Sequence, residues 1–199
     1  MPPEPFDHWR GELVRLRKIE PTDWEQFQAI DRSDSEGQRN GYFIPPGQST
    51  LDYQEWTKTE ATRKFPEAND DWRWAIEVLR TGLVAGSMNV HSSDRQHGRF
   101  EYGIALGPEF RNQRYAADAV KLLCRHYFGE LRYHRLSGLV YAFNAHSQHF
   151  HERFGFTLEG RVREYLFTAG RFHDVLWFGL TAEEFWAKYP EMRAGPWQA

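Results

Sequence analysis

The chain has 199 residues, with 25 lysines and arginines against 28 aspartates and glutamates, and its net charge is −3. This balance excludes bulk binding of a polyanion, and the lack of a long apolar run excludes a membrane-spanning helix. The single cysteine, Cys124, excludes an intrachain disulfide, and the N-terminus lacks a signal-peptide core, so we expect a cytoplasmic protein with one domain over 1–199.

The N-terminal half of the chain predicts a strand, two helices and a hairpin. Prolines near the start indicate a loose arm over 1–11, and alternating apolar and basic residues at 13–19 indicate a strand with one solvent-facing side. Pro21 opens a helix, and the turn formers of 34–49 predict a long loop of the kind that is often functional. The next expected elements are a helix over about 51–65 and two strands at 72–79 and 83–91.

The C-terminal half predicts strands and helices in turn. The expected elements are strand 99–106, helix 116–130, strand 136–143, helix 147–153, strands 157–167 and 173–180, helix 182–188 and a polar tail over 189–199. These elements predict one α/β domain of about seven strands around three or four helices. Because Cys124 falls inside an apolar helix pattern, we expect it in the core rather than as a reactive thiol.

The densest signal lies at 99–123, where a strand gives way to a helix. The turn between them ends in basic and amide residues, Arg111 to Arg114, and opens directly into the helix. Such a junction directs several backbone N–H groups and the positive end of the helix at one point, which suits a phosphate. The sequence has neither the Walker nor the Rossmann glycine pattern, so the chemistry has to be argued from other motifs.

Several short motifs follow one another in a fixed order. They are Arg-Asn-Gln-Arg-Tyr-Ala at 111–116, Asn-Ala-His-Ser at 144–147, Glu-Arg-Phe-Gly-Phe at 152–156, and two closing pieces at 159–163 and 170–174. Together they resemble the GNAT family of N-acetyltransferases, in particular the RimJ/RimL-like branch and bacterial spermidine acetyltransferase. The resemblance covers 13–186 and implies the GNAT fold, an α/β (α+β) domain whose central mixed, mostly antiparallel sheet of about seven strands is flanked by helices.

The resemblance implies an enzyme that transfers an acetyl group from acetyl-CoA to a primary amine, a small amine or a protein N-terminus, by direct attack on the thioester. The implied cofactor-binding residues are Leu106, Arg111, Asn112, Gln113, Arg114, Tyr115, Ala116, Ala117, Asn144 and Ser147. Arg114 stands where the family motif has glycine, a residue used for positive φ or for close approach to a phosphate. Its guanidinium either clamps a phosphate or turns outward.

Three side chains are candidate catalytic groups by the same resemblance. Ser147 is the first candidate to protonate the leaving thiolate, and its alternative role is a helix N-cap. His151 stands where many family members carry a tyrosine acid, and its alternative is an inert, partly exposed helix histidine. Glu101 either deprotonates the incoming ammonium through water or serves as a structural carboxylate. A backbone N–H near Leu106 is the implied donor to the thioester oxygen.

Two other classes stay open at this point: a non-catalytic acyl-CoA-binding or sensing relative, and an interaction domain that keeps only the fold. We expect no metal, although His146, His149 and His151 are close in sequence, because neither a carboxylate nor a second cysteine accompanies them at ligand spacing. The expected partners are acetyl-CoA and an amine acceptor, without nucleic acid or membrane, and the chain is expected as a monomer or homodimer.

The identity of the acceptor amine is left open by the sequence. Asp31, Asp34 and Glu36 would suit a polyamine or another cationic amine, whereas Arg39 would suit an acidic group. We expect the loop at 34–49 and the turn near Gly170 to border the acceptor site.

Overall fold

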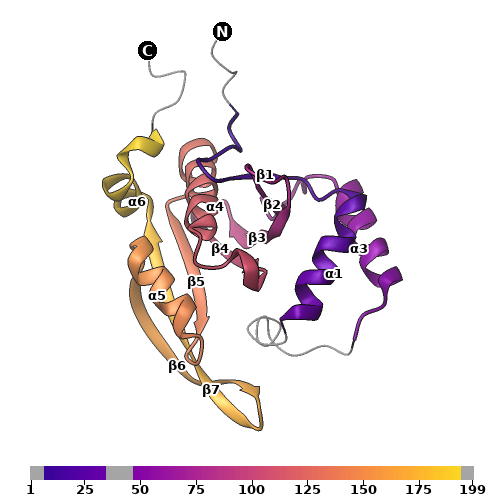
Figure 1. The fold of residues 1–199 in the computed structure, drawn as a ribbon. Coiled ribbons are helices and arrows are strands. Elements are labelled where there is room, and N and C mark those ends of the chain that lie inside the picture. Colours follow the sequence, from indigo (N-terminus) through magenta and orange to yellow (C-terminus); the bar gives the residue numbers. More distant parts are fainter. Residues whose placement is uncertain (1–6, 35–46, 194–199) are drawn as a thin grey trace.

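The computed structural model describes residues 7–34 and 47–193, which form a seven-stranded sheet flanked by helices (Figure 1). The strand order is β1-β2-β3-β4-β5-β7-β6, and neighbouring strands are antiparallel except β4 and β5, which are parallel. The predicted mixed, mostly antiparallel sheet is therefore confirmed. The strands are β1 Val14–Arg17, β2 Arg73–Val78, β3 Val84–Asp94, β4 Arg99–Leu106, β5 Arg135–Tyr141, β6 Thr157–Thr168 and β7 Arg171–Thr181.

Helices cover both faces of the sheet. On β2, Trp74 and Ile76 belong to the core that includes α4, whereas Ala75 between them packs in a second cluster with Phe27 of α1 and Tyr53 of α3. Alternate residues of this strand thus serve opposite faces. Figure 1 shows α1 and α3 next to each other at one end of the molecule. The α-helices are α1 Trp24–Ser33, α3 Thr50–Thr62, α4 Tyr115–Cys124, α5 Ala145–Phe154 and α6 Ala182–Lys188.

The helix predicted over 116–130 is α-helical only as far as Cys124. A π-helical turn, Arg125–Glu130, replaces its second half. The wider turn carries the neighbouring rings of Tyr127 and Phe128, which are both buried and both lie against Phe100. Cys124 itself is fully buried, and burial raises the pKa of its thiol, so the prediction of a core cysteine is confirmed.

The start of the chain is held to α4 by one carboxylate. Asp118, in the first turn of α4, accepts hydrogen bonds from the backbone N–H groups of Leu13 at 2.7 Å, Val14 at 2.9 Å and Glu12 at 3.3 Å. Trp9 packs on Trp74, with ring centroids 5.4 Å apart. Of the loose arm expected over 1–11, His8 and Trp9 are therefore packed against His126 and Trp74, and residues 1–6 lie outside the described part of the chain.

The expected polar tail also begins with packed residues. The Tyr189 hydroxyl donates to the Phe154 carbonyl at 2.9 Å, and Met192 lies against the main core. Of the loop predicted at 34–49, residues 35–46 are outside the described residues, and so are Glu36 and Arg39. Over the ranges that the structure describes, every helix is too short or too polar to cross a bilayer.

Candidate active site

The sheet opens between its two parallel strands. β4 and β5 pair only where Arg99, Phe100 and Glu101 face the first residues of β5. β4 nevertheless continues to Leu106 and β5 to Tyr141. Beyond Glu101, β5 therefore no longer pairs with β4, and this edge of β4 is open. An extended ligand can bind such an edge as an added strand does.

Leu106 presents its backbone to this open edge. The next residue, Gly107, donates its N–H to the Ala85 carbonyl of β3 at 2.9 Å. Because successive N–H groups of a strand point to opposite sides, the N–H of Leu106 points away from β3. The Leu106 carbonyl accepts a hydrogen bond from Nε of Arg111 at 3.1 Å. The strand β4 thus ends with an N–H donor in a fixed position, on the side where β5 no longer pairs with it.

The turn after β4 is fixed by the side chain of Arg111. Besides its bond to Leu106, the Arg111 guanidinium forms an ion pair with Asp34, just after the end of α1. Arg111 therefore holds the turn to β4 and to α1 in this structure.

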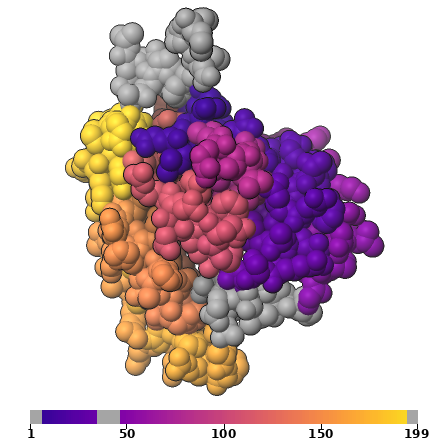
Figure 2. Space-filling model, viewed as in Figure 1, coloured from indigo at the N-terminus to yellow at the C-terminus, as the bar shows by residue number. Residues whose placement is uncertain are grey.

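The turn that leads into α4 has the backbone conformation for which the family motif uses glycine. Asn112 and Arg114 both take positive φ, 60° and 64°. The side chain of Arg114 is exposed and does not cap the helix. The N–H groups in the first turn of an α-helix have no partners inside the helix, so the first turn of α4 presents donors and positive potential to an anion. In Figure 2, α4 and the turn before it lie between the N-terminal helices and the C-terminal part of the chain.

The beginning of α5 forms the other side of the opening. Asn144 is the N-cap, because its Oδ1 accepts a hydrogen bond from the N–H of Ser147 at 3.0 Å. The alternative interpretation of Ser147 as the N-cap is therefore wrong. Ser147 lies inside the first turn and is half-buried, so its hydroxyl is not used for capping.

His151 is buried, which corrects the expectation of a partly exposed histidine. Its side chain packs one turn below Ser147 against Phe178, and the residue is 5% exposed. Its Nδ1 lies 2.7 Å from the Ser147 carbonyl, which can only accept, so Nδ1 carries the proton. Its Nε2 is then the acceptor for the Tyr102 hydroxyl at 3.0 Å. Both ring nitrogens are thus occupied, and burial lowers the pKa of His151 to about 4.

The low pKa of His151 predicts a loss of stability in acid. A histidine in an unfolded chain has a pKa of about 6.5, so between about pH 6.5 and 4 the unfolded state binds more protons. The free energy of unfolding should fall in this window by up to about 1.4 kcal/mol per pH unit. Urea unfolding at pH 7 and pH 5 measures the loss, which should be about 2 kcal/mol smaller in His151→Gln because glutamine does not titrate. The exposed His149→Gln variant should keep the wild-type loss. If His151→Gln lost as much unfolding free energy between pH 7 and pH 5 as the wild-type protein, the pKa of His151 in the folded state would not be lowered.

Glu101 and Ser147 lie toward opposite faces of the sheet. Tyr102 reaches His151 of α5, and its strand neighbour Glu101 points to the other face. There the Glu101 carboxylate is 3.7 Å from Nε2 of His91 on β3. The two candidate groups therefore approach the opening between β4 and β5 from opposite sides rather than forming one cluster.

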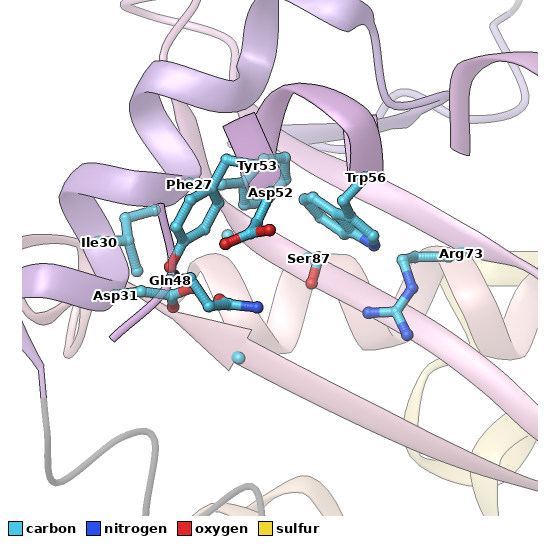
Figure 3. A pocket seen from close by; sticks show the side chains of 11 residues that line it. Phe27, Ile30, Asp31, Gln48, Asp52, Tyr53, Trp56, Arg73 and Ser87 are labelled. Carbon is cyan, nitrogen blue, oxygen red and sulfur yellow. Dashed lines mark hydrogen bonds between the residues drawn. The ribbon is translucent and has the colours of Figure 1, made fainter. Parts of the chain in front are cut away.

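A cavity of about 280 Å³ lies on the face to which Glu101 points (Figure 3). Ala105 and Ser87, which are opposite each other on β4 and β3, form part of its wall. Asp31 lines it as well, and accepts a hydrogen bond from the Tyr53 hydroxyl at 2.8 Å. The remaining lining residues are Phe27, Ile30, Gln48, Asp52, Trp56, Arg73 and Gly86.

Sequence reasoning found Asp31 but missed Arg73, Ser87 and Tyr53 as cavity residues. Alternation could have placed Arg73 and Ser87 on the same face as Glu101 once the strand pairing was known. The packing of α1 and α3 over that face had no signal in the sequence pattern. In the described part of the chain, no three histidine, cysteine or acidic side chains gather as a metal site.

Comparison with known proteins gives a consistent result. The family model described as "Acetyltransferase (GNAT) domain" matches residues 14–157. The chain is 32% identical to the SPbeta prophage-derived uncharacterized N-acetyltransferase YokL of Bacillus subtilis, over 89% of this chain and 95% of YokL. It is 25% identical to the putative ribosomal N-acetyltransferase YdaF of the same organism, over 87% and 94%. The solved spermidine N-acetyltransferase of Vibrio cholerae, in complex with CoA and spermine, superposes with a TM-score of 0.72 at 20% identity, over 86% of this chain and 97% of that one.

Proposed function

Because the chain belongs to the GNAT acetyltransferase family and is an N-acetyltransferase, we propose that it transfers the acetyl group of acetyl-CoA to a primary amine by direct attack on the thioester. The observation that carries the proposal is the opening between β4 and β5. The helix α4, whose first residue receives no side-chain cap, begins a short turn after the end of β4, and His151 of α5, one turn from Ser147, is bonded to Tyr102 of β4. These features supply an anion site, an edge for an extended arm and a proton donor.

The residues 111–117 would hold the pyrophosphate of the cofactor. Positive φ at Asn112 and Arg114 turns the backbone so that α4 begins at Tyr115 with free N–H groups. These donors bind a phosphate without a counter-charge from a side chain. The pantetheine arm would then run along the open edge of β4, and the N–H of Leu106 would donate to the thioester oxygen as negative charge develops there.

Ser147 would protonate the thiolate that leaves. Nδ1–H of His151 bonds the Ser147 carbonyl and lies 3.4 Å from Ser147 Oγ. Since this nitrogen carries a proton, only a lone pair of Oγ faces His151, and the hydroxyl proton is free to be donated elsewhere. Asn144 and His151 act as positioning residues for this hydroxyl, because both are bonded to the backbone of Ser147.

Glu101 would act from the opposite face as the base, through water. An amine that enters from the side of the cavity meets the thioester carbon on one face, while the thiolate departs toward α5. The amine nitrogen bonds to the carbonyl carbon, the carbon–sulfur bond breaks and Glu101 receives the nitrogen proton through water. Ser147 gives its hydroxyl proton to sulfur and takes one from solvent, to which Glu101 later returns the proton it received. The separation of Glu101 from Ser147 matches this division of roles.

Acetyl-CoA should raise the melting temperature of the protein. A ligand that binds only the folded state adds about 2.7 kcal/mol at a hundredfold excess over its Kd. A thermal unfolding series with acetyl-CoA, with CoA, and with pantetheine as a control lacking the phosphates measures this. We expect both phosphorylated ligands to stabilise the protein and pantetheine to have a much smaller effect. A melting temperature that stays flat up to millimolar acetyl-CoA would overturn the proposal, and CoA release in the presence of an amine panel tests turnover directly.

A further inference from the structure

The cavity beside β4 carries opposite charges at its two ends. In Figure 3, Arg73 lies at one end of the group, Asp31 and Gln48 lie at the other, and Trp56, Ser87 and Asp52 lie between them, Asp52 being hydrogen-bonded to Ser49. A cavity of about 280 Å³ is large enough for a small organic molecule.

The positive end of the cavity holds the guanidinium of Arg73, whose burial is only partly compensated by its neighbours. Nε of Arg73 is buried and has no hydrogen-bond partner, and the ion pairs formed within 7–34 and 47–193 do not include this residue. The nearby carboxylate of Glu60 is paired with Arg63 at 3.5 Å, and Arg63 adds repulsion. Burial lowers the pKa of Arg73, but a guanidinium stays charged at neutral pH. A half-buried cation without a counter-ion is costly, and an anion entering the cavity would offset that cost.

The negative end is the one nearer the end of β4. Asp31 follows Ile30, whose side chain lies directly over Gly107, where a methyl group would approach it to 2.9 Å. Burial raises the pKa of Asp31, and Tyr53 donates a hydrogen bond that opposes this shift. When ionised, the Asp31 carboxylate attracts an ammonium group to this end of the cavity, which its neighbour Ile30 places beside Gly107 and the end of β4, where acetyl transfer is proposed.

The sheet geometry sets the distance between the two ends. Ala105 pairs with Ser87, Ser87 pairs with Ala75, and Arg73 is two residues along β2 from Ala75. Two strand spacings and two residues along a strand place the Cα atoms of Ala105 and Arg73 about 12 Å apart. The Arg73 side chain lines the cavity and shortens the span that remains, so a ligand that joins both ends needs only a short chain of atoms.

We propose that the acceptor is a short primary amine that carries an oxyanion, either a carboxylate or a phosphate, and that Arg73 binds this oxyanion. The inference rests on the proposed acetyl transfer and narrows its substrate class. It also sets this chain apart from a polyamine acetyltransferase, because a second ammonium group on the acceptor would meet the Arg73 cation.

Acceptors of one length but different end groups test the proposal. We would measure kcat/KM with 5-aminopentanoate, 3-aminopropyl phosphate, pentylamine and 1,5-diaminopentane, using acetyl-CoA and following CoA release. The wild-type protein should prefer the better of the two anionic acceptors at least tenfold over pentylamine and over the diamine, and the two anionic acceptors distinguish carboxylate from phosphate.

Two substitutions at one position locate the effect. Arg73→Gln should lower kcat/KM for the preferred anionic acceptor about 10- to 100-fold, the range for losing a charge-assisted hydrogen bond, and leave pentylamine within threefold. Arg73→Glu should reverse the order in favour of the diamine. Arg80→Gln removes an exposed arginine that does not line the cavity and should keep the wild-type preference. The Kd for acetyl-CoA and the melting temperature of each variant report whether it is folded.

Equal or better use of pentylamine or the diamine by the wild-type protein would overturn the proposal. So would a loss in Arg73→Gln that is the same for all four acceptors. If none of the four acceptors is acetylated, the two anionic acceptors are titrated into the CoA complex to measure whether they bind. If neither of them binds, the inference is overturned. The proposed function fails separately, through absence of CoA binding.

Discussion

Ser147→Ala is expected to lower kcat by about 100-fold or more, at the lower end of what a positioned general acid contributes, while the Kd for acetyl-CoA changes less than threefold. The sulfur gains its charge only as the carbon–sulfur bond breaks, so a group that protonates it acts on the transition state rather than on the bound cofactor. The expectation depends on a hydroxyl proton that neither capping nor His151 uses, and the contacts around Ser147 leave it so. Stopped-flow or single-turnover kinetics should be used, so that acetyl transfer is the step measured.

The conservative variant separates chemistry from structure. Ser147→Thr keeps the hydroxyl and should retain most of the wild-type rate, whereas a merely structural serine would tolerate alanine in a helix at least as well as threonine. The pH profile of kcat gives a second readout, because loss of an internal acid should make the rate depend on protonation by solvent. An unchanged single-turnover rate in Ser147→Ala would remove Ser147 from the reaction.

Arg114→Gly should move stability and cofactor affinity in opposite directions. A non-glycine residue in the left-handed region costs about 1–2 kcal/mol, and Arg114 has φ of 64°, so glycine relieves strain in the folded backbone. Part of that gain is offset because glycine has more freedom in the unfolded chain. If the guanidinium clamps a phosphate, the same change weakens CoA binding about 10- to 100-fold. Calorimetric titration and urea unfolding of the same samples measure the two effects.

Ligand and salt controls locate the clamp. Arg114→Lys keeps a positive charge on the strained backbone and should lose less affinity than the glycine variant. Comparison of CoA with dephospho-CoA shows whether the side chain reaches the 3′-phosphate, and the wild-type advantage should shrink at high salt because an exposed pair is screened. Equal or tighter CoA binding by Arg114→Gly at low salt would mean that the arginine turns outward.

The fold was predictable where local signals agree with tertiary structure. β4 spans 99–106 and α6 spans 182–188 as expected. α6 has a reciprocal capping box between Thr181 and Glu184 that fixes its start. The π-helical turn after Cys124 was not predictable, because over six residues its apolar spacing is indistinguishable from that of an α-helix. The strands and helices that carry the sequence motifs formed as predicted, but the sequence alone could not show which of their side chains face the ligand.

The candidate site shows where sequence reasoning stops. The glycine motif left two explanations open at Arg114, positive φ or close approach to a phosphate, and the structure shows the positive φ. The burial of His151 was not foreseeable, because it depends on Tyr102 from β4 and Phe178 from β7 meeting one face of α5. Arg73 was missed for the same kind of reason. Its position matters only because two strand registers and two helices bring it to the cavity that Asp31 also lines.

The order β5-β7-β6 has a consequence for how the chain is made. β7, the last strand in the described part of the chain, lies between β5 and β6 and pairs with β5 over Val175–Thr181 and with β6 between Arg171 and Gly179. Until Thr181 has left the ribosome, β5 keeps an open edge and β6 has no strand to join, so half of the sheet cannot close during translation. A premature stop just after β6 would therefore remove the strand that connects the edge to the centre, and leave two unpaired edges of the kind that aggregate. Completion of the β5-β7-β6 part of the sheet therefore waits for β7, although the motif-bearing middle of the chain precedes it.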